Sequence, residues 1–248
     1  MLLEQALSLL RQGQISQARS IYEQVLQADP EQPQALHMLG LICYQCGDLE
    51  KAHQFLVQSL EQQPDDITAM GNLASVLASL GRVQQAVLVL NHILEIAPDQ
   101  ARYWRSLGDC LAELRRLDEA VHAYEQAMRL WPGKSDMGAM PLNLAVSLAG
   151  LGRYEESCEQ LKMIVSREPE NTVALYNLGY CLRELGEHEQ AVQVYNRVLE
   201  LDPEDSLGVS LYLAAIGSRT RPDSAPRELM RRVFDHYAGY YDRHMCES

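Results

Sequence analysis

The sequence predicts an all-α protein in which a helix-turn-helix unit of about 34 residues is repeated six times. Three series of residues recur along the 248-residue chain with the same spacing. The series are Pro30, Pro64, Pro98, Pro132, Pro169 and Pro203; Ala6, Gly40, Ala74, Gly108, Ala145 and Gly179; and Ala18, Ala52, Ala86, Ala120, Ser157 and Ala191. Because all three keep steps of 34, 34, 34, 37 and 34 residues in phase, they indicate an internal repeat.

Each repeat contains two amphipathic helical patterns separated by a turn. In "ALHMLGLICYQCGDLEKAHQFLVQSLEQQP", apolar residues recur at helical spacing on both sides of Gly47. Glycine tolerates the positive φ that ends a helix, and five repeats have it at this turn. The five are Gly13, Gly47, Gly81, Gly152 and Gly186. The fourth repeat has Arg115 instead. The small residues of the other two series are expected where the two helices cross, and the prolines are expected to end the second helix.

The repeats predict domain boundaries along the whole chain. The expected units are residues 1–32, 33–66, 67–100, 101–134, 138–171 and 172–205. A capping helix over 206–217, a linker over 218–226 and an aromatic amphipathic helix over 227–248 should follow. The three extra residues within "GKSDMGAM" (133–140) lengthen one step to 37. We expect them to change the superhelical step between the fourth and fifth repeats.

The fourth repeat, "YWRSLGDCLAELRRLDEAVHAYEQAMRLWP", closely resembles the tetratricopeptide repeat. The residues that match its signature positions are Trp104, Leu107, Gly108, Leu111, Ala120, Tyr124, Ala127 and Pro132. "LYNLGYCLRELGEHEQAVQVYNRVLELDP" in the sixth repeat matches almost as well. The resemblance covers residues 1–204. It implies a right-handed superhelical solenoid whose first helices line a concave groove that binds peptides or partner segments. We therefore expect a protein-binding scaffold, with no enzymatic activity and no cofactor.

Repeat register selects the side chains expected to line this groove. They are Gln34, His37, Tyr44, Asn72, Arg102, Arg105, Asn143, Tyr176, Asn177, Tyr180 and Arg183. Arginine binds carboxylates through paired, charge-assisted hydrogen bonds. Three arginines on one face of an acidic array therefore favour an acidic or carboxylate-ended peptide. The alternative is that these arginines pair with the nearby Asp109 and Glu184.

Asn72, Asn143 and Asn177 occupy equivalent positions in three repeats, with Ser106 between them. In O-linked N-acetylglucosamine transferases, an asparagine ladder at the matching position holds an extended peptide. An amide side chain can donate to a backbone carbonyl and accept from a backbone N–H, which suits this role. The alternative is that these asparagines only pack or hydrate the groove.

The C-terminal segment does not follow the repeat. "PDSAPRELMRRVFDHYAGYYDRHM" resembles the junction in bacterial proteins that join tetratricopeptide repeats to a class I S-adenosylmethionine-dependent methyltransferase. Phe234, Tyr237 and Tyr241 lie on its apolar face and are the expected docking residues. The catalytic fold, which needs a strand and a glycine-rich turn, is not in this sequence. Either the sequence is a fragment that ends before that domain, in which case the array is expected to be the substrate-recognition part of such a methyltransferase, or it is a shortened relative. The remaining alternatives are a helix that packs on the array and one that forms a homodimer.

Composition limits the classes of partner and the cellular compartment that we expect. A formal net charge of −13 argues against nucleic acid, which requires concentrated Lys and Arg. No apolar run approaches the ~18 residues that span a bilayer, so we expect no membrane partner. The start of the chain shows no secretory leader, and the six cysteines sit within helical patterns, which favours reduced thiols and a cytoplasmic location. Cys43 and Cys46 lack the second close pair that structural zinc requires.

Overall fold

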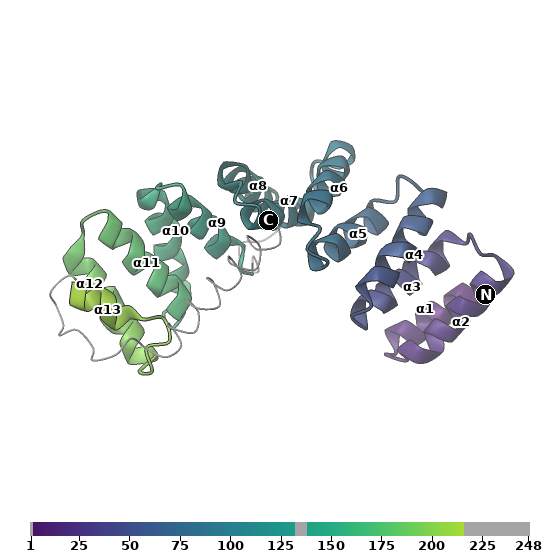
Figure 1. Cartoon of the computed structure of the whole chain (residues 1–248), viewed down its shortest axis with the longest axis horizontal. Helices are drawn as coiled ribbons and strands as arrows, with labels where there is room; N and C mark the ends of the chain where they lie inside the picture. Colours follow the sequence, from purple (N-terminus) through teal and green to yellow (C-terminus); the bar gives the residue numbers. More distant parts are fainter. Residues whose placement is uncertain (1, 132–137, 216–248) are drawn as a thin grey trace, which may run out of the picture. The chain divides into compact units, whose positions relative to one another are not determined.

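The computed structural model describes residues 2–131 and 138–215, and within them the chain is entirely helical (Figure 1). The helices are α1 (Leu2–Arg11), α2 (Ile15–Ala28), α3 (Pro33–Gln45), α4 (Leu49–Gln62), α5 (Ile67–Ser79), α6 (Val83–Ile96), α7 (Ala101–Glu113), α8 (Leu117–Leu130), α9 (Met140–Gly150), α10 (Tyr154–Arg167), α11 (Thr172–Glu184), α12 (His188–Leu201) and α13 (Val209–Ala215). The predicted all-α class is confirmed.

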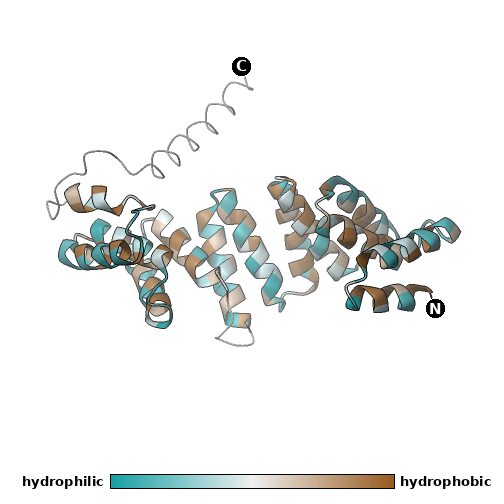
Figure 2. Cartoon of the chain, turned by 90° about the horizontal axis from the view of Figure 1, so that it is seen from below, coloured by the Kyte–Doolittle hydropathy of each residue, from teal (hydrophilic) through white to brown (hydrophobic). Residues whose placement is uncertain are grey.

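The chain divides into two compact units, which we call the N-terminal unit (Met1–Met137) and the C-terminal unit (Gly138–Ser248). The N-terminal unit contains α1 to α8, and the C-terminal unit contains α9 to α13. The division falls in the segment where the repeat spacing lengthens to 37 residues. Within each unit, every helix packs against the next one along the chain, so the core is a continuous strip between paired helices. Hydrophobic and hydrophilic positions alternate along the helices, as amphipathic packing requires (Figure 2).

A very close helix pairing occurs where a glycine of the first helix faces a tyrosine of the second. A Cβ placed on Gly108 would lie 2.6 Å from the ring of Tyr124, and one on Gly179 would lie 2.5 Å from the ring of Tyr195. Both rings are buried. The ring therefore occupies the space that a Cβ would need, which explains why glycine holds the small position in these two repeats.

The third residue series lies at the centre of each helix pair. All six of its members are fully buried. Ser157 is the one member that is not alanine, and its hydroxyl donates a hydrogen bond of 2.7 Å to the carbonyl of Ala145 on the partner helix. The extra polar atom is therefore satisfied inside the core, where an unpaired hydroxyl would be costly.

The turns follow the glycine pattern. The five turn glycines have φ between 72° and 80°, the left-handed region that ends a helix. Arg115 replaces glycine in the fourth repeat and still adopts φ 60°. A non-glycine residue there carries a conformational cost, which the packing of α7 on α8 offsets. The prolines described at repeat ends follow the second helix by two residues, as predicted.

The helix expected after the sixth repeat begins at Val209, three residues later than residue 206. The Asp205 carboxylate accepts hydrogen bonds from the backbone N–H groups of Val209 (2.6 Å) and Ser210 (3.1 Å), so it acts as the cap. Gly208, with φ 70°, prevents an earlier start. Val209 and Leu213 are fully buried in the C-terminal unit, where α13 packs on α12. The predicted linker and aromatic helix lie outside the described residues.

We predict that Gly108→Ala destabilises the chain by about 1 kcal/mol. Overpacking against Tyr124 costs ~1–3 kcal/mol, and better helix propensity returns ~1 kcal/mol. Two other repeats combine alanine with leucine at these positions (Ala74 with Leu90, Ala145 with Leu161). In a Tyr124→Leu background, Gly108→Ala should therefore become neutral or stabilising. Denaturant unfolding of the four proteins measures this coupling, and an equal cost in both backgrounds would contradict the assigned contact.

Candidate functional site

The predicted groove residues lie on the first helix of each repeat. In the N-terminal unit they are Gln34, His37 and Tyr44 on α3, Asn72 on α5, and Arg102 and Arg105 on α7. In the C-terminal unit they are Asn143 on α9, and Tyr176, Asn177, Tyr180 and Arg183 on α11. We call each set, with the other residues in the same register, the first-helix face of its unit.

His37 and Asn72 bind to one another across neighbouring repeats. The Asn72 amide nitrogen lies 2.7 Å from Nε2 of His37, and Nδ1 of His37 lies 3.7 Å from a carboxylate oxygen of Asp66. This arrangement suits a neutral imidazole that accepts at Nε2 and carries its proton on Nδ1. His37 is only 7% exposed, and burial lowers its pKa, although the charge of Asp66 opposes the shift. The pair joins α3 to α5.

The remaining α3 candidates differ in their surroundings. Gln34 is exposed at the start of the helix. Tyr44 is half-buried near the helix end, and its hydroxyl lies 3.2 Å from the hydroxyl of Ser79 on α5. A second contact thus joins the two first helices, and Gln34 is left as the solvent-facing polar group of α3 among the predicted residues.

Arg102 and Arg105 are exposed on α7. The Arg102 guanidinium lies 4.5 Å from the centre of the Tyr103 ring, whose hydroxyl donates to the carbonyl of Ile67 at 3.0 Å. Arg105 faces Asp109 at 3.9 Å, a long contact between two side chains that are each more than 40% exposed. Such a pair contributes little and is easily exchanged, so both arginines keep hydrogen-bonding capacity for a ligand.

Arg183 has a structural environment that the sequence did not predict. Its guanidinium lies 5.0 Å from the Tyr180 ring centre and 4.8 Å from that of Tyr212, and it pairs with Glu184. The Tyr176 hydroxyl lies 3.3 Å from the Tyr212 hydroxyl. These contacts hold α13 against α11. Arg183 therefore serves the end of the array directly, and the pairing with Glu184 that we considered is present.

The predicted asparagine ladder is partly engaged within the protein. The Asn177 amide donates to the Val173 carbonyl of its own helix at 2.8 Å, and Asn72 contacts His37. Asn143 is half-buried on α9. Ser106, between them in register, donates to the Arg102 carbonyl at 3.1 Å. An amide that uses one N–H as a donor still has a second N–H and a carbonyl acceptor. These bonds alone therefore do not prevent the asparagines from binding a peptide backbone.

Two exposed valines complete the first-helix face of the C-terminal unit. Val146 on α9 is 45% exposed, and Val173 on α11 is 47% exposed. Leu142, one helical turn before Val146, packs partly into the core, as do Tyr176 and Tyr180. Val173 was not among the predicted residues, although it occupies the same register position as Gln34 and Arg102. The exposure of its side chain identifies Val173 as a further residue of the first-helix face.

The cysteines within the described part of the chain show no arrangement suited to metal. Cys43 is buried and Cys46 is exposed, and no group of three or more His, Cys, Asp or Glu side chains in the described residues could hold an ion. Burial raises the pKa of Cys110 and of Cys158 to about 11, so both remain thiols at neutral pH. None of the helices in residues 2–131 and 138–215 combines the length and apolar character needed to span a membrane.

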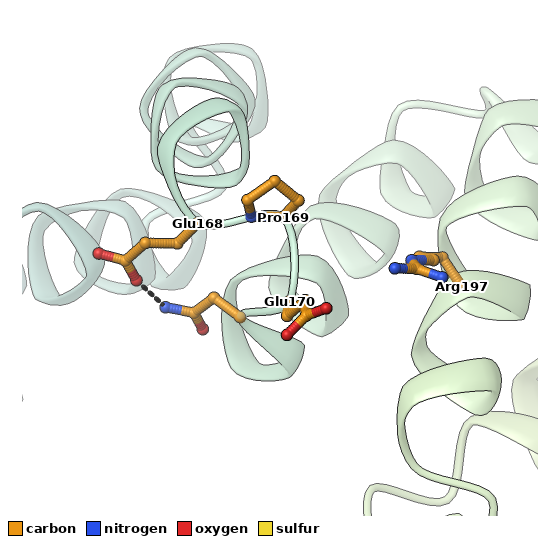
Figure 3. Close-up of a pocket in the computed structure, with 5 residues that line it drawn as sticks. Glu168, Pro169, Glu170 and Arg197 are labelled. Atoms are coloured by element: carbon orange, nitrogen blue, oxygen red, sulfur yellow. Dashed lines mark hydrogen bonds between the residues drawn. The ribbon is translucent and has the colours of Figure 1, made fainter.

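An open hollow of about 530 Å³ lies beside the turn between α10 and α11 (Figure 3). Glu168, Pro169 and Glu170 form one side, and Arg197 of α12 faces them from the other. The Glu168 carboxylate accepts from the Asn171 amide at 2.8 Å, and Arg197 is paired with Glu200 at 2.8 Å. These two charged groups are thus occupied by local partners, which gives the hollow the character of a surface depression.

Comparisons with known families agree with this architecture. A tetratricopeptide repeat model matches residues 9–68 and 47–110, and a model described as the cytochrome c-type biogenesis protein H TPR domain matches residues 83–208, half of the chain. The chain belongs to the tetratricopeptide repeat family. The repeats of this family are helical interaction scaffolds without catalytic chemistry of their own. No curated protein matches the sequence.

Solved tetratricopeptide repeat structures share the fold at low identity. YrrB, described as having an unusual peptide-binding site, is 17% identical with a TM-score of 0.69, over 78% of this chain and 97% of its own. PilF of Pseudomonas aeruginosa is 17% identical with a TM-score of 0.67, over 86% and 96%. MamA is 17% identical with a TM-score of 0.64, over 72% and 96%. At such identities the likeness establishes the fold alone.

We predict that His37 makes the fold less stable in mild acid. Its pKa is lowered in the folded state, so the unfolded chain binds more protons as pH falls below about 6.5. Stability should be full above that pH and decline below it. Denaturant unfolding at pH 7.5 and 5.5 measures the change, with His37→Gln as the control that keeps a hydrogen-bonding side chain. An equal loss in both proteins would show that other groups are responsible.

Proposed function

We propose that this tetratricopeptide repeat protein is a scaffold that binds a peptide or partner segment on its first-helix faces. The observation that carries the proposal is the exposure of Val146 and Val173 on α9 and α11. Neither side chain is needed for the core. Exposed valines, together with the half-buried rings of Tyr176 and Tyr180 on α11, suit apolar side chains of a partner.

The two faces differ in chemistry. The face of the N-terminal unit presents Arg102 and Arg105 with Gln34, so it favours carboxylate groups. The face of the C-terminal unit presents valine and tyrosine, so it favours apolar side chains. We propose that Asn72, Asn143 and Asn177 add hydrogen bonds to a ligand backbone through their remaining donor and acceptor groups. The partner is then a protein segment and not a nucleic acid or a membrane, and a cytoplasmic location fits it.

The apolar part of the proposal is tested with Val146→Asp and Val173→Asp. Peptides selected from a phage-displayed library of random 12-residue sequences serve as the probe. Each substitution should weaken the selected peptides about ten-fold, because it replaces ~1.5 kcal/mol of apolar burial by a desolvated charge. Leu88→Asp is the matched control, since Leu88 is 63% exposed but lies on α6, a second helix. Equal losses in all three variants would contradict the face assignment.

The cationic part is tested with the double variant Arg102→Glu, Arg105→Glu. Acidic peptides from the same selection should lose about five-fold in affinity, more at low salt than at high salt. Arg129→Glu provides the control, because Arg129 is exposed on α8 outside the face. If Arg129→Glu has the same effect, the arginines act only through the net charge of the protein.

The C-terminal sequence supports a second proposal, in which the array is the substrate-recognition part of an S-adenosylmethionine-dependent methyltransferase. The support is the resemblance of the segment around Phe234, Tyr237 and Tyr241 to the junction of such proteins; these residues lie outside the described part of the chain. The gene downstream of codon 248 decides: a strand and glycine-rich turn within about 50 codons would support it. A stop codon there would contradict it and favour a docking or homodimer role for the helix.

A further inference from the structure

We propose that a hollow formed by α6, α7 and α8 of the N-terminal unit accepts a lysine or arginine side chain from a partner protein. The hollow has a volume of about 320 Å³. Its α7 residues are Trp104, Leu107 and Leu111. Residues two positions apart lie ~200° apart around a helix, so these side chains leave α7 on the side opposite Arg102 and Arg105. The hollow is therefore separate from the first-helix face.

The floor of the hollow is apolar and its wall is aromatic. Leu107, Leu111 and Ala123 are buried beneath it. Trp104 and His122 form the wall, with ring centres 6.0 Å apart and an interplanar angle of 85°. The Trp104 indole N–H donates to the Pro98 carbonyl at 2.8 Å. Because this bond holds the indole in place, the wall is formed before any ligand arrives, which lowers the entropic cost of binding.

The rim of the hollow carries a negative charge that no described side chain pairs. Arg116 makes two hydrogen bonds of 2.7 Å to the Glu119 carboxylate, which neutralises that residue. Asp118 is exposed and has no hydrogen bond or ion pair to any other described residue. Asn91 of α6 adds an amide to the lining. The mouth therefore carries one carboxylate that has no partner among the described residues, within a chain whose net charge is −13.

This combination matches a cationic side chain with an aliphatic stem. The stem of lysine or arginine packs on the leucine floor, as such stems do on apolar surfaces. The charged head lies against the indole, where cation–π attraction favours it, and pairs with Asp118. An acidic side chain would be repelled by Asp118. A purely apolar side chain would leave that carboxylate desolvated without a partner.

The aromatic wall is particular to this repeat. Trp104 occupies a signature position of the family, but the other repeats fold with different pairs at the positions of Trp104 and His122. These pairs are Leu2 with Ser20, Leu36 with Gln54, Met70 with Leu88, Pro141 with Glu159, and Leu175 with Gln193. Packing of a helix pair thus does not require the two rings. His122 and Asp118 are both exposed, so their types are also unconstrained by the core.

The test uses the full chain with Trp131→Phe, which leaves Trp104 as the single tryptophan of the two in the sequence. The probes are 12-residue peptides that alternate glycine with lysine, with arginine, or with acetyl-lysine, at 150 mM salt to suppress long-range attraction. The lysine or the arginine peptide should change Trp104 emission on binding, and the acetyl-lysine peptide should not. The comparison of the first two peptides identifies the preferred cation.

Two substitutions separate the hollow from general charge attraction. Asp118→Asn should weaken binding about four-fold, whereas Glu125→Gln, an exposed site on the same helix, should weaken it less than about two-fold. Trp104→Leu, the residue found at the equivalent position of three other repeats, should weaken binding of a dye-labelled peptide about five-fold by anisotropy while leaving helicity unchanged. No emission change with either cationic peptide, or equal losses for Asp118→Asn and Glu125→Gln, would overturn the proposal.

Discussion

The structure depends on how closely the two helices of each repeat approach one another. At Gly108 and Gly179 of the first helix, the facing tyrosine ring lies where a Cβ would be. Where alanine occupies this position, the facing side chain is leucine in two of three repeats. The contact sets the separation of the helices, and the separation sets which side chains reach the core and which remain on the surface. The faces that we propose to bind a partner consist of the side chains that this close approach leaves on the surface.

Contacts between neighbouring repeats then determine which of the outward side chains remain available. His37 and Asn72 satisfy one another, and Arg183 bridges Tyr180 and Tyr212. These residues hold adjacent first helices in register. Exposed side chains such as Arg102, Val146 and Val173 do not form strong contacts of this kind between neighbouring helices. A residue on such a face can therefore either join neighbouring repeats or remain exposed, and its contacts in the structure show which of the two applies.

The repeats also differ in whether a buried tyrosine hydroxyl group finds a hydrogen-bond partner. Three of them have tyrosine at the position that fills the helix crossing. The Tyr124 hydroxyl donates to Asp109 at 2.8 Å, but the hydroxyls of Tyr22 and Tyr195 find no acceptor among the described residues. The position equivalent to Asp109 holds Leu7 in the first repeat and Tyr180 in the sixth, so neither offers a carboxylate. The ring fills space in all three repeats, whereas the hydroxyl is satisfied in one, so shape rather than polarity explains the tyrosine.

The sequence by itself determined the helix pairs, their turns and the small residues at their crossings. These features follow from local rules: helical periodicity, glycine at a positive φ, and proline after a helix end. Even the exception at Arg115 was visible as a break in the pattern.

What the sequence could not determine was the pairing of side chains 35 or 36 residues apart, such as His37 with Asn72 and Tyr176 with Tyr212. It also did not reveal that Val173 is exposed or that Trp104, His122 and Asp118 surround one hollow. Those relations depend on the rotation and rise between neighbouring helices, which are set by the packing of whole side chains and not by spacing along the chain. Only the tertiary structure decided which residues of each face are engaged in holding the array together and which remain exposed on the surface.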